Sequence, residues 1–203
     1  MTGKGSFARH ASGPARHTSC HIQVARHLVG LTVLVCGSLM PPIAGGQEAK
    51  PTEYEVEAAY LSNFGRFVEW PARQAGSEAF NVCVFGQDPF GPLLDGALRG
   101  ETIGSAPMVA KRLTGMEEAS GCRILFISSS KDTQIAAVLM TLGTSNVLTV
   151  SDMAGFTRRG GMIQFVVEGN RVRFEINLSA AQRAGLGLSS QLLKLATAVR
   201  RSP

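Results

Sequence analysis

The order of apolar segments between residues 80 and 150 places the strongest limit on how this chain can fold. Four segments there have the short length and the apolar or β-branched character of strands: Phe80–Phe85, Pro107–Arg112, Arg123–Ser128 and 146–150. Helical patterns over 92–98 and 131–142 alternate with them. This alternation favours a parallel sheet with helical crossovers, and the nearly continuous apolar run of Arg123–Ser128 predicts a strand buried on both faces.

A helix precedes these strands. Apolar residues at helical spacing predict a helix over 52–69, which begins after the N-cap residue Thr52 and stops before Pro71. Three acidic residues suit the positive end of its dipole: Glu53, Glu55 and Glu57.

The C-terminal part has a different pattern. Met162–Val167 and Arg171–Ile176 flank the turn sequence of residues 168–170 and predict a β-hairpin. Two further helices are expected, over Ala180–Ala184 and Ser189–Val199. Residues 47–203 are therefore predicted to form a single α/β domain, with a mostly parallel sheet flanked by helices and a C-terminal β-hairpin.

The first 46 residues have the order of a secretory signal. A basic, acid-free lead precedes the apolar run Leu28–Met40, and small residues at 44–46 precede Gln47. This order predicts a signal peptide over 1–46, cleaved after Gly46, and hence export to the periplasm. The run is shorter than the roughly 20 residues that a membrane span needs. Two alternatives stay open: a retained N-terminal anchor, and a lipoprotein signal that ends at Cys36.

The net positive charge of the chain is concentrated in its first 46 residues. The whole chain has a formal charge of +5 and a pI of about 9.3. Four of its 20 basic residues and none of its 15 acidic residues lie in 1–46, so residues 47–203 carry sixteen basic and fifteen acidic residues. All four histidines also lie in that first segment. A nearly neutral domain without histidine does not suggest nucleic-acid binding, and it excludes catalysis or metal binding that depends on histidine.

Cys83 and Cys122 are the two cysteines outside the first 46 residues. In an exported protein, such a pair most simply forms one disulfide, which closes a loop of about 40 residues and stabilises the fold by about 3–4 kcal/mol. The alternative is two buried free thiols, because both cysteines lie in apolar segments. No zinc site is expected, because two cysteines without histidine supply too few ligands.

The last predicted strand carries the main candidate binding residues. Alternation places Arg173, Glu175 and Asn177 on one face of that strand, opposite its apolar residues. We interpret this face as a docking surface for a small anionic or amphoteric ligand, or for a protein partner. Three residues elsewhere in the sequence are candidates to complete it: Asn63, Arg66 and Arg183. The alternative is a surface ion pair, worth at most about 1 kcal/mol.

Two aromatic residues are further candidates. Phe156 stands beside Arg158 and Arg159 in the loop Met153–Met162, a combination typical of partner-binding loops, although Phe156 would also suit the core. Trp70, directly before Pro71, suits either a binding hot spot or a cover for the sheet edge or core.

Other reactive groups have structural explanations. Ser128–Ser130 has neither a glycine-rich cradle nor a histidine base, and it suits a strand-to-helix turn with an N-cap. Gly160-Gly161 suits the turn into the hairpin. Three carboxylates suit solvated charge rather than a cluster: Asp88, Asp95 and Glu101. We therefore expect that the protein is not an enzyme and needs no cofactor or metal.

Seven segments, taken in order and spacing, occur together in one known family: Ala58–Pro71, Phe85–Gly91, Cys122–Ser128, Leu148–Asp152, Gly160–Ile163, Asn170–Asn177 and Ser189–Leu195. They span about residues 53–199, and the chain resembles the YfiR family of periplasmic repressors. The resemblance implies an exported α/β protein, typically a homodimer, with a disulfide between Cys83 and Cys122. The type member has a second disulfide, which this chain lacks because no cysteine follows Cys122.

The resemblance also implies a function. The expected protein is a periplasmic, non-catalytic regulator that binds the periplasmic sensor region of an inner-membrane diguanylate cyclase, inhibits it, and so lowers cyclic di-GMP and biofilm formation. An outer-membrane lipoprotein can sequester such a repressor. The alternative is a periplasmic small-molecule-binding or sensing protein that acts with another membrane receptor. It would use the crevice at the carboxyl ends of the parallel strands.

Overall fold

The computed structural model describes residues 51–71 and 79–201. All of them belong to the unit Gln47–Pro203, and the predicted signal peptide with its alternatives lies outside the described residues. Within the described ranges, no helix has both the length and the apolar character that crossing a membrane requires.

An eight-stranded mixed sheet forms the centre of the fold, with strand order β10-β8-β7-β6-β5-β2-β4-β3. Its parallel strands are β2 (Phe80–Phe85), β4 (Ala106–Leu113), β5 (Ile124–Ile127), β6 (Leu148–Ser151) and β7 (Ile163–Glu168). β8 (Arg171–Asn177) is antiparallel to β7, and β10 (Ala198–Arg200) is parallel to β8. The short β3 (Thr102–Ile103) pairs antiparallel with β4. The predicted α/β fold with a late β-hairpin is therefore correct.

Helices cover both faces of this sheet. α1 (Glu53–Phe67), α2 (Pro92–Leu98), α4 (Leu178–Arg183) and α5 (Ser190–Leu195) pack on one face, which we call the α1 face. α3 (Ile135–Leu142) and the 3-10 helices η1 (Met116–Gly121), η2 (Ser129–Gln134) and η3 (Thr157–Arg159) lie along the other, which we call the α3 face. Strand alternation divides the core accordingly, so that Phe126 packs on the α1 face and Ile127 on the α3 face.

The sequence predicts the start of α1 correctly. The Thr52 hydroxyl accepts a hydrogen bond from the backbone N–H of Glu55, and the Glu55 side chain accepts one from the backbone N–H of Thr52. This reciprocal pair is a capping box. The helix ends at Phe67, two residues before the predicted end, because Val68–Glu69 form β1 and pair with β9 (Gly187–Leu188) in a small second sheet.

Two other predicted helices need correction. Residues 131–142 divide into the 3-10 helix η2 and the α-helix α3, and Ser128 caps η2 by accepting a hydrogen bond from the backbone N–H of Ser130. The helix predicted over Ser189–Val199 ends at Leu195, because Ala198–Arg200 leave the helix to pair with β8 as β10. The pairing gives the backbone groups at the edge of β8 hydrogen-bond partners. This tertiary contact prevails over the helical spacing of the apolar residues in the local sequence.

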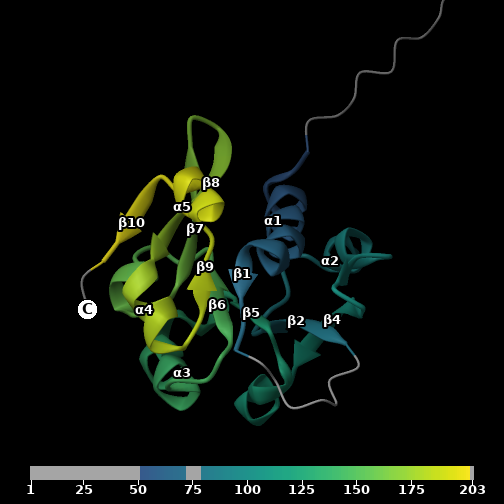
Figure 1. Ribbon diagram of the computed structural model, residues 1–203, viewed down its shortest axis with the longest axis horizontal. Coiled ribbons are helices and arrows are strands. Elements are labelled where there is room, and N and C mark those ends of the chain that lie inside the picture. Colours follow the sequence, from purple (N-terminus) through teal and green to yellow (C-terminus); the bar gives the residue numbers. More distant parts are fainter. Residues whose placement is uncertain (1–50, 72–78, 202–203) are drawn as a thin grey trace, which may run out of the picture. The chain divides into compact units, whose positions relative to one another are not determined.

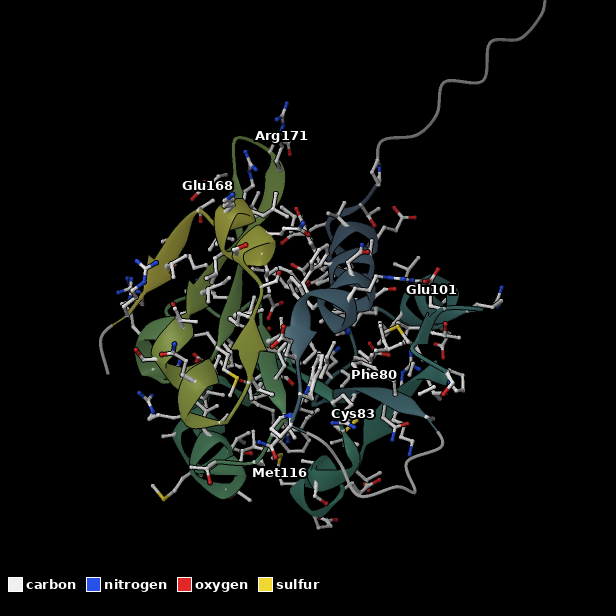
Figure 2. All side chains as sticks on the ribbon, viewed as in Figure 1. Phe80, Cys83, Glu101, Met116, Glu168 and Arg171 are labelled. Carbon is white, nitrogen blue, oxygen red and sulfur yellow. A yellow bond between two sulfur atoms is a disulfide. The ribbon has the colours of Figure 1, made fainter. Side chains whose placement is uncertain are left out.

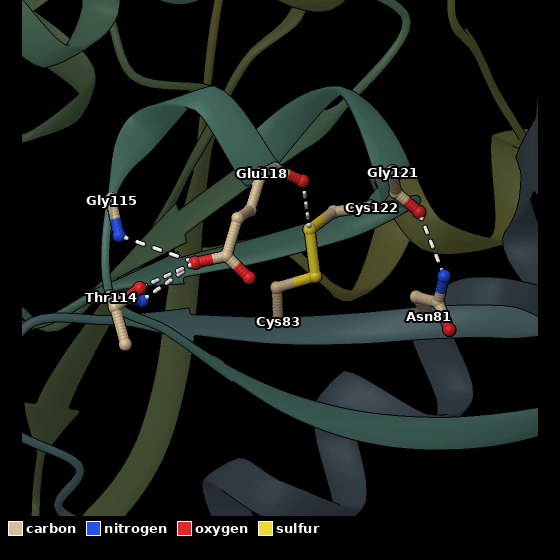
Figure 3. The surroundings of a disulfide bond; sticks show 7 residues. All are labelled: Asn81, Cys83, Thr114, Gly115, Glu118, Gly121 and Cys122. Carbon is tan, nitrogen blue, oxygen red and sulfur yellow. Dashed lines mark hydrogen bonds between the residues drawn. A yellow bond between two sulfur atoms is a disulfide. The ribbon is translucent and has the colours of Figure 1, made fainter.

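The disulfide prediction is confirmed. Cys83 in β2 is joined to Cys122, directly after η1, with their Cα atoms 5.9 Å apart. Figure 3 shows hydrogen bonds that also hold η1, from the two residues before it and from β2. The Glu118 carboxylate accepts hydrogen bonds from Thr114 and Gly115, and the Asn81 side chain donates one to the carbonyl of Gly121. The covalent bond thus fixes η1 against the α3 face, where both cysteines are buried.

Candidate functional site

The polar residues of β8 share the α3 face, as alternation predicts. The Asn177 side chain is buried, donates to the carbonyl of Thr157 at 2.9 Å and accepts from the backbone N–H of Ala180 at 3.0 Å. Glu175 accepts a hydrogen bond from the Thr157 hydroxyl at 3.1 Å. Arg173 is exposed. Asn177 and Glu175 therefore hold η3 and cap α4, which leaves Arg173 as the exposed member of the set.

The structure does not bring Asn63 and Arg66 to this polar set. Both are on α1, which packs on the opposite face of the sheet, where Phe64 contacts Phe174 edge-on at 5.4 Å. Asn63 donates to the carbonyl of Ala59, and Arg66 forms an ion pair with Glu101. Arg183 lines a separate hollow with residues of α3 and the loop after it. The six predicted residues therefore do not form one pocket.

Phe156 is a core residue and not a surface residue. Its side chain is fully buried on the α3 face, and a Cβ atom built on Gly161 would lie 2.2 Å from its ring. Only glycine allows the backbone to pass this close. Trp70 is half-buried and packs edge-on against Phe80, in agreement with a covering role. The docking interpretation of Phe156 is therefore wrong, because the ring has no accessible surface.

The three carboxylates singled out in the sequence each meet an arginine. Asp88 and Asp95 both accept hydrogen bonds from Arg112, at 2.8 and 2.7 Å, which lowers the pKa of Asp95. Glu101 pairs with Arg66. The serines after β5 also have structural partners, since the Ser130 hydroxyl accepts from the backbone N–H of Gln87. The three carboxylates are thus ion-paired, rather than solvated by themselves as the sequence predicted, and Asp88 and Asp95 share one arginine.

A groove of about 300 Å³ separates the start of α1 from the tip of the β7–β8 hairpin. Its walls come from both elements: Pro51, Thr52, Glu53 and Val56 from the α1 side, and Val167, Asn170, Arg171 and Val172 from the hairpin. Figure 2 shows Glu168 and Arg171 at the outer end of the hairpin, where they form a cross-strand pair. Val167 is 54% exposed although it is apolar. The groove thus combines apolar walls with a charged rim, as partner and ligand sites commonly do.

An acidic cluster lies at the same end of α1. Glu57 is fully buried, and neither of its carboxylate oxygens has a hydrogen-bond partner among the described residues. Burial, followed by the charges of Asp152 and Glu53, raises the pKa of Glu57 to about 8. Burial also raises the pKa values of Asp152 and Tyr54. Because its pKa of about 8 lies above 7, Glu57 is mostly protonated at neutral pH.

The cluster stands at the carboxyl ends of the parallel strands. Asp152 directly follows β6, and the Tyr54 ring contacts Phe90, in the loop after β2, at 5.8 Å. The neighbouring strands β2 and β5 lead into helices on opposite faces of the sheet, α2 on the α1 face and η2 with α3 on the α3 face. Such a switch point is where open α/β sheets usually place a ligand site.

Sequence reasoning missed this cluster, although one signal was present. Glu57 was assigned to the positive end of the helix dipole, but Glu57, Leu61 and Phe64 recur at helical spacing and are all buried. A carboxylate in the apolar stripe of a helix already indicates a buried charge. Nothing local signals that Asp152 acts on the pKa of Glu57, because the two residues are far apart in sequence and come near each other only through the packing of α1 on the sheet.

Comparisons with known proteins identify the relatives of the chain. A family model described as YfiR/HmsC-like (DUF4154) matches residues 54–197. The crystal structure of a conserved domain protein from Vibrio cholerae O1 biovar El Tor superposes with a TM-score of 0.52 at 10% identity, covering 75% of this chain and 62% of that one. The chain therefore spans less than two thirds of that protein, and the likeness shows the fold alone.

A second solved structure is less similar. It is the ABC domain in complex with L-Trp from Streptococcus pneumoniae, with a TM-score of 0.49 and 9% identity. The match covers 70% of this chain and 60% of that one, and no inference is drawn from it.

Proposed function

The chain belongs to the YfiR/HmsC-like family, and from this membership we propose that it is an exported, non-catalytic regulator. It binds the periplasmic sensor region of an inner-membrane diguanylate cyclase, holds the enzyme inactive, and so lowers cyclic di-GMP and biofilm formation. The family match over residues 54–197 is the observation that carries this proposal. The buried disulfide supports it, because such bonds persist in an oxidising compartment such as the periplasm.

The β7–β8 hairpin is the surface that we assign to the partner. Val167 exposes 54% of its surface at the hairpin, next to the charged Glu168 and Arg171, and Arg173 is exposed farther along β8. An exposed apolar side chain within a charged rim is typical of a transient protein interface. Other members of the proposed system are a second copy of the chain and an outer-membrane lipoprotein that sequesters the regulator.

The test replaces an exposed valine by aspartate at two places. Val167→Asp puts a charge on the hairpin, and Val109→Asp makes the same change on β4, near the other edge of the sheet, where Val109 is 39% exposed. In a strain that lacks the gene, the wild type and Val109→Asp should lower cyclic di-GMP, whereas Val167→Asp should not. Co-purification with the membrane cyclase should weaken at least tenfold for Val167→Asp alone, which corresponds to about 1.4 kcal/mol.

Two outcomes would count against parts of this proposal. If deletion of the gene leaves cyclic di-GMP unchanged and no membrane cyclase co-purifies, the regulator function is wrong. If Val167→Asp acts like Val109→Asp while the deletion raises cyclic di-GMP, the function stands and the hairpin is not the docking surface.

A second candidate function is a small-molecule sensor that acts with another membrane receptor. The observation that favours it is the acidic cluster around Glu57, whose carboxyl oxygens have no partner among the described residues. Retention of a membrane protein other than a cyclase, together with ligand binding, would support this candidate.

A further inference from the structure

We propose that a hollow at the carboxyl ends of β4, β2 and β5 binds the charged group of a small organic anion, a carboxylate or a phosphate, through the ammonium group of Lys131. This proposal does not rest on the diguanylate cyclase as partner, because none of the residues that line the hollow belongs to the β7–β8 hairpin.

Three adjacent parallel strands end at this hollow. Phe85, the last residue of β2, pairs in register with Leu113 at the end of β4 and with Ile127 at the end of β5. The hollow has a volume of about 340 Å³, and its walls are Phe85, Leu113, the residues that follow them and the start of η2. The helices after β2 and β5 lie on opposite faces of the sheet. The crevice beyond the carboxyl ends of two such strands is where open α/β sheets usually bind a ligand.

Lys131 supplies a positive charge at the hollow. Its Nζ atom lies 4.7 Å from the centroid of the Phe85 ring, which places the ammonium group beside one wall of the hollow. The ion pairs of the described residues are made by Arg66, Arg112 and Arg159, and Lys131 takes part in none of them. The ammonium group can therefore donate hydrogen bonds to an anion without first leaving a carboxylate.

A close approach of two loops places a second donor next to Lys131. The Ser130 hydroxyl accepts a hydrogen bond from the backbone N–H of Gln87 at 2.9 Å, so its own proton is available to a ligand. Gly86 has a φ angle of 101°, and a Cβ atom built on it would lie 2.6 Å from Ser130 Oγ and 3.0 Å from Lys131 Cγ. Glycine thus lets the loop after β2 pass against η2 and keeps both donors at the hollow.

The carboxylates close to these residues are already engaged. Thr114 lines the hollow, but its hydroxyl donates to the Glu118 carboxylate at 2.8 Å (Figure 3) and is not available to an anion. Asp132, next to Lys131 in the sequence, pairs with Arg159. Among the described residues, no acidic one lines the hollow. We therefore expect the anion beside Lys131 rather than beside Thr114, where the charge of Glu118 would repel it.

The walls of the hollow define the rest of the ligand. Phe85 and Leu113 are buried and give the hollow apolar walls. The volume of about 340 Å³ is at the lower end of the range for small-molecule sites. One ammonium group between apolar walls suits one anionic group on a small apolar body. A carboxylate and a phosphate both accept charge-assisted hydrogen bonds, and the experiment distinguishes them.

The experiment uses the mature protein and three probes with the same aromatic ring. Benzoate and phenyl phosphate carry an anionic group, whereas benzamide has nearly the shape of benzoate without its charge. Calorimetry at pH 7 should show binding of at least one of the two anions and no binding of benzamide. The anion that binds more tightly identifies the charged group, and its affinity should fall as salt is added.

Three variants locate the site. Lys131→Met keeps the apolar length of the side chain without its charge and should weaken anion binding about tenfold, as expected for the loss of a charge-assisted hydrogen bond. Lys131→Arg keeps the charge and should retain the binding. The matched control is Lys194→Met, at an exposed position on α5, which should bind like the wild type.

Three results would each overturn the proposal. The first is equal binding of benzoate and benzamide, and the second is binding of neither anion. The third is equal anion binding by Lys131→Met and Lys194→Met, which would place the anion elsewhere on the protein.

Discussion

At the scale of single residues, glutamates of this chain behave differently because their surroundings differ. Glu118 is exposed at η1, and hydrogen bonds from Thr114 and Gly115 to its carboxylate lower its pKa. Glu57 has no such donors, and burial beside other acids raises its pKa to about 8. The first glutamate stabilises a turn in its charged form, whereas the second is compatible with the core only in its neutral form.

We predict that Glu57→Gln makes the fold more stable at neutral pH. The unfolded chain loses the Glu57 proton near the ordinary pKa of 4.5, but the folded chain keeps it until about pH 8. The folded state therefore holds more protons in this window, and wild-type stability falls as pH rises from 4.5 to 8, by about 1.4 kcal/mol per pH unit at most. Glutamine removes this loss, so the variant should gain about 3 kcal/mol relative to the wild type between pH 4 and pH 7.

Urea unfolding of both proteins at several pH values measures this difference. Glu117→Gln serves as the exposed control and should follow the wild type at every pH. Parallel stability curves for the wild type and Glu57→Gln would show that Glu57 is ionised in the folded protein.

At the scale of elements, short segments owe their positions to tertiary contacts. η1 is a 3-10 helix of six residues, and it is held on the sheet by the disulfide to β2 and by the hydrogen bond from Asn81 to Gly121. β10 has three residues and exists through its pairing with β8. Such elements contain too few internal hydrogen bonds to be stable by themselves.

We predict that removal of the disulfide destabilises the domain by about 4 kcal/mol, because the bond closes a loop with a sequence separation of 39 residues. The double variant Cys83→Ala/Cys122→Ala avoids burying a hydroxyl group and should match the reduced wild type in urea unfolding. Mass spectrometry of the exported, unreduced protein should find the two cysteine peptides linked. Two free thiols in that sample would contradict the bond.

At the scale of the whole molecule, the acidic cluster and the β7–β8 hairpin lie at the same edge of the sheet, where the parallel strands β2, β5, β6 and β7 end. The carboxyl ends of β2, β5 and β6 meet the start of α1, where Glu57, Asp152 and Tyr54 gather. The hairpin extends beyond this edge and forms the far wall of the groove. A ligand in the groove would therefore touch the same hairpin that we assign to the protein partner.

The export of the molecule is a prediction at the same scale. We expect the mature protein to begin at Gln47, because small residues at 44–46 follow the apolar run of the signal. Mass spectrometry of the periplasmic fraction should find this N-terminus. An intact N-terminus in the membrane fraction would indicate a retained anchor, and a lipid-modified Cys36 would indicate a lipoprotein; both outcomes contradict cleavage after Gly46.

The sequence by itself determined the elements whose cause is local. Signals within a few neighbouring residues predicted three features correctly: the strands β2, β5 and β6 from their apolar runs, the start of α1 from Thr52, and the hairpin from the turn sequence at 168–170. Hairpin geometry explains the last case, since Gly169 and Asn170 both have positive φ angles, as a tight turn of this kind requires. The pairing of Cys83 with Cys122 was also predictable, because no other cysteine follows residue 46.

Only the tertiary structure decided which residues meet. Periodicity defines the two faces of a strand or a helix, but it does not say which element covers each face. For that reason Asn63 and Arg66 were wrongly grouped with Arg173, although α1 packs on the other side of the sheet. For the same reason the effect of Asp152 on Glu57 was missed: the charge of Asp152 raises the pKa of Glu57 only because the packing of α1 on the sheet brings two acids distant in sequence near each other.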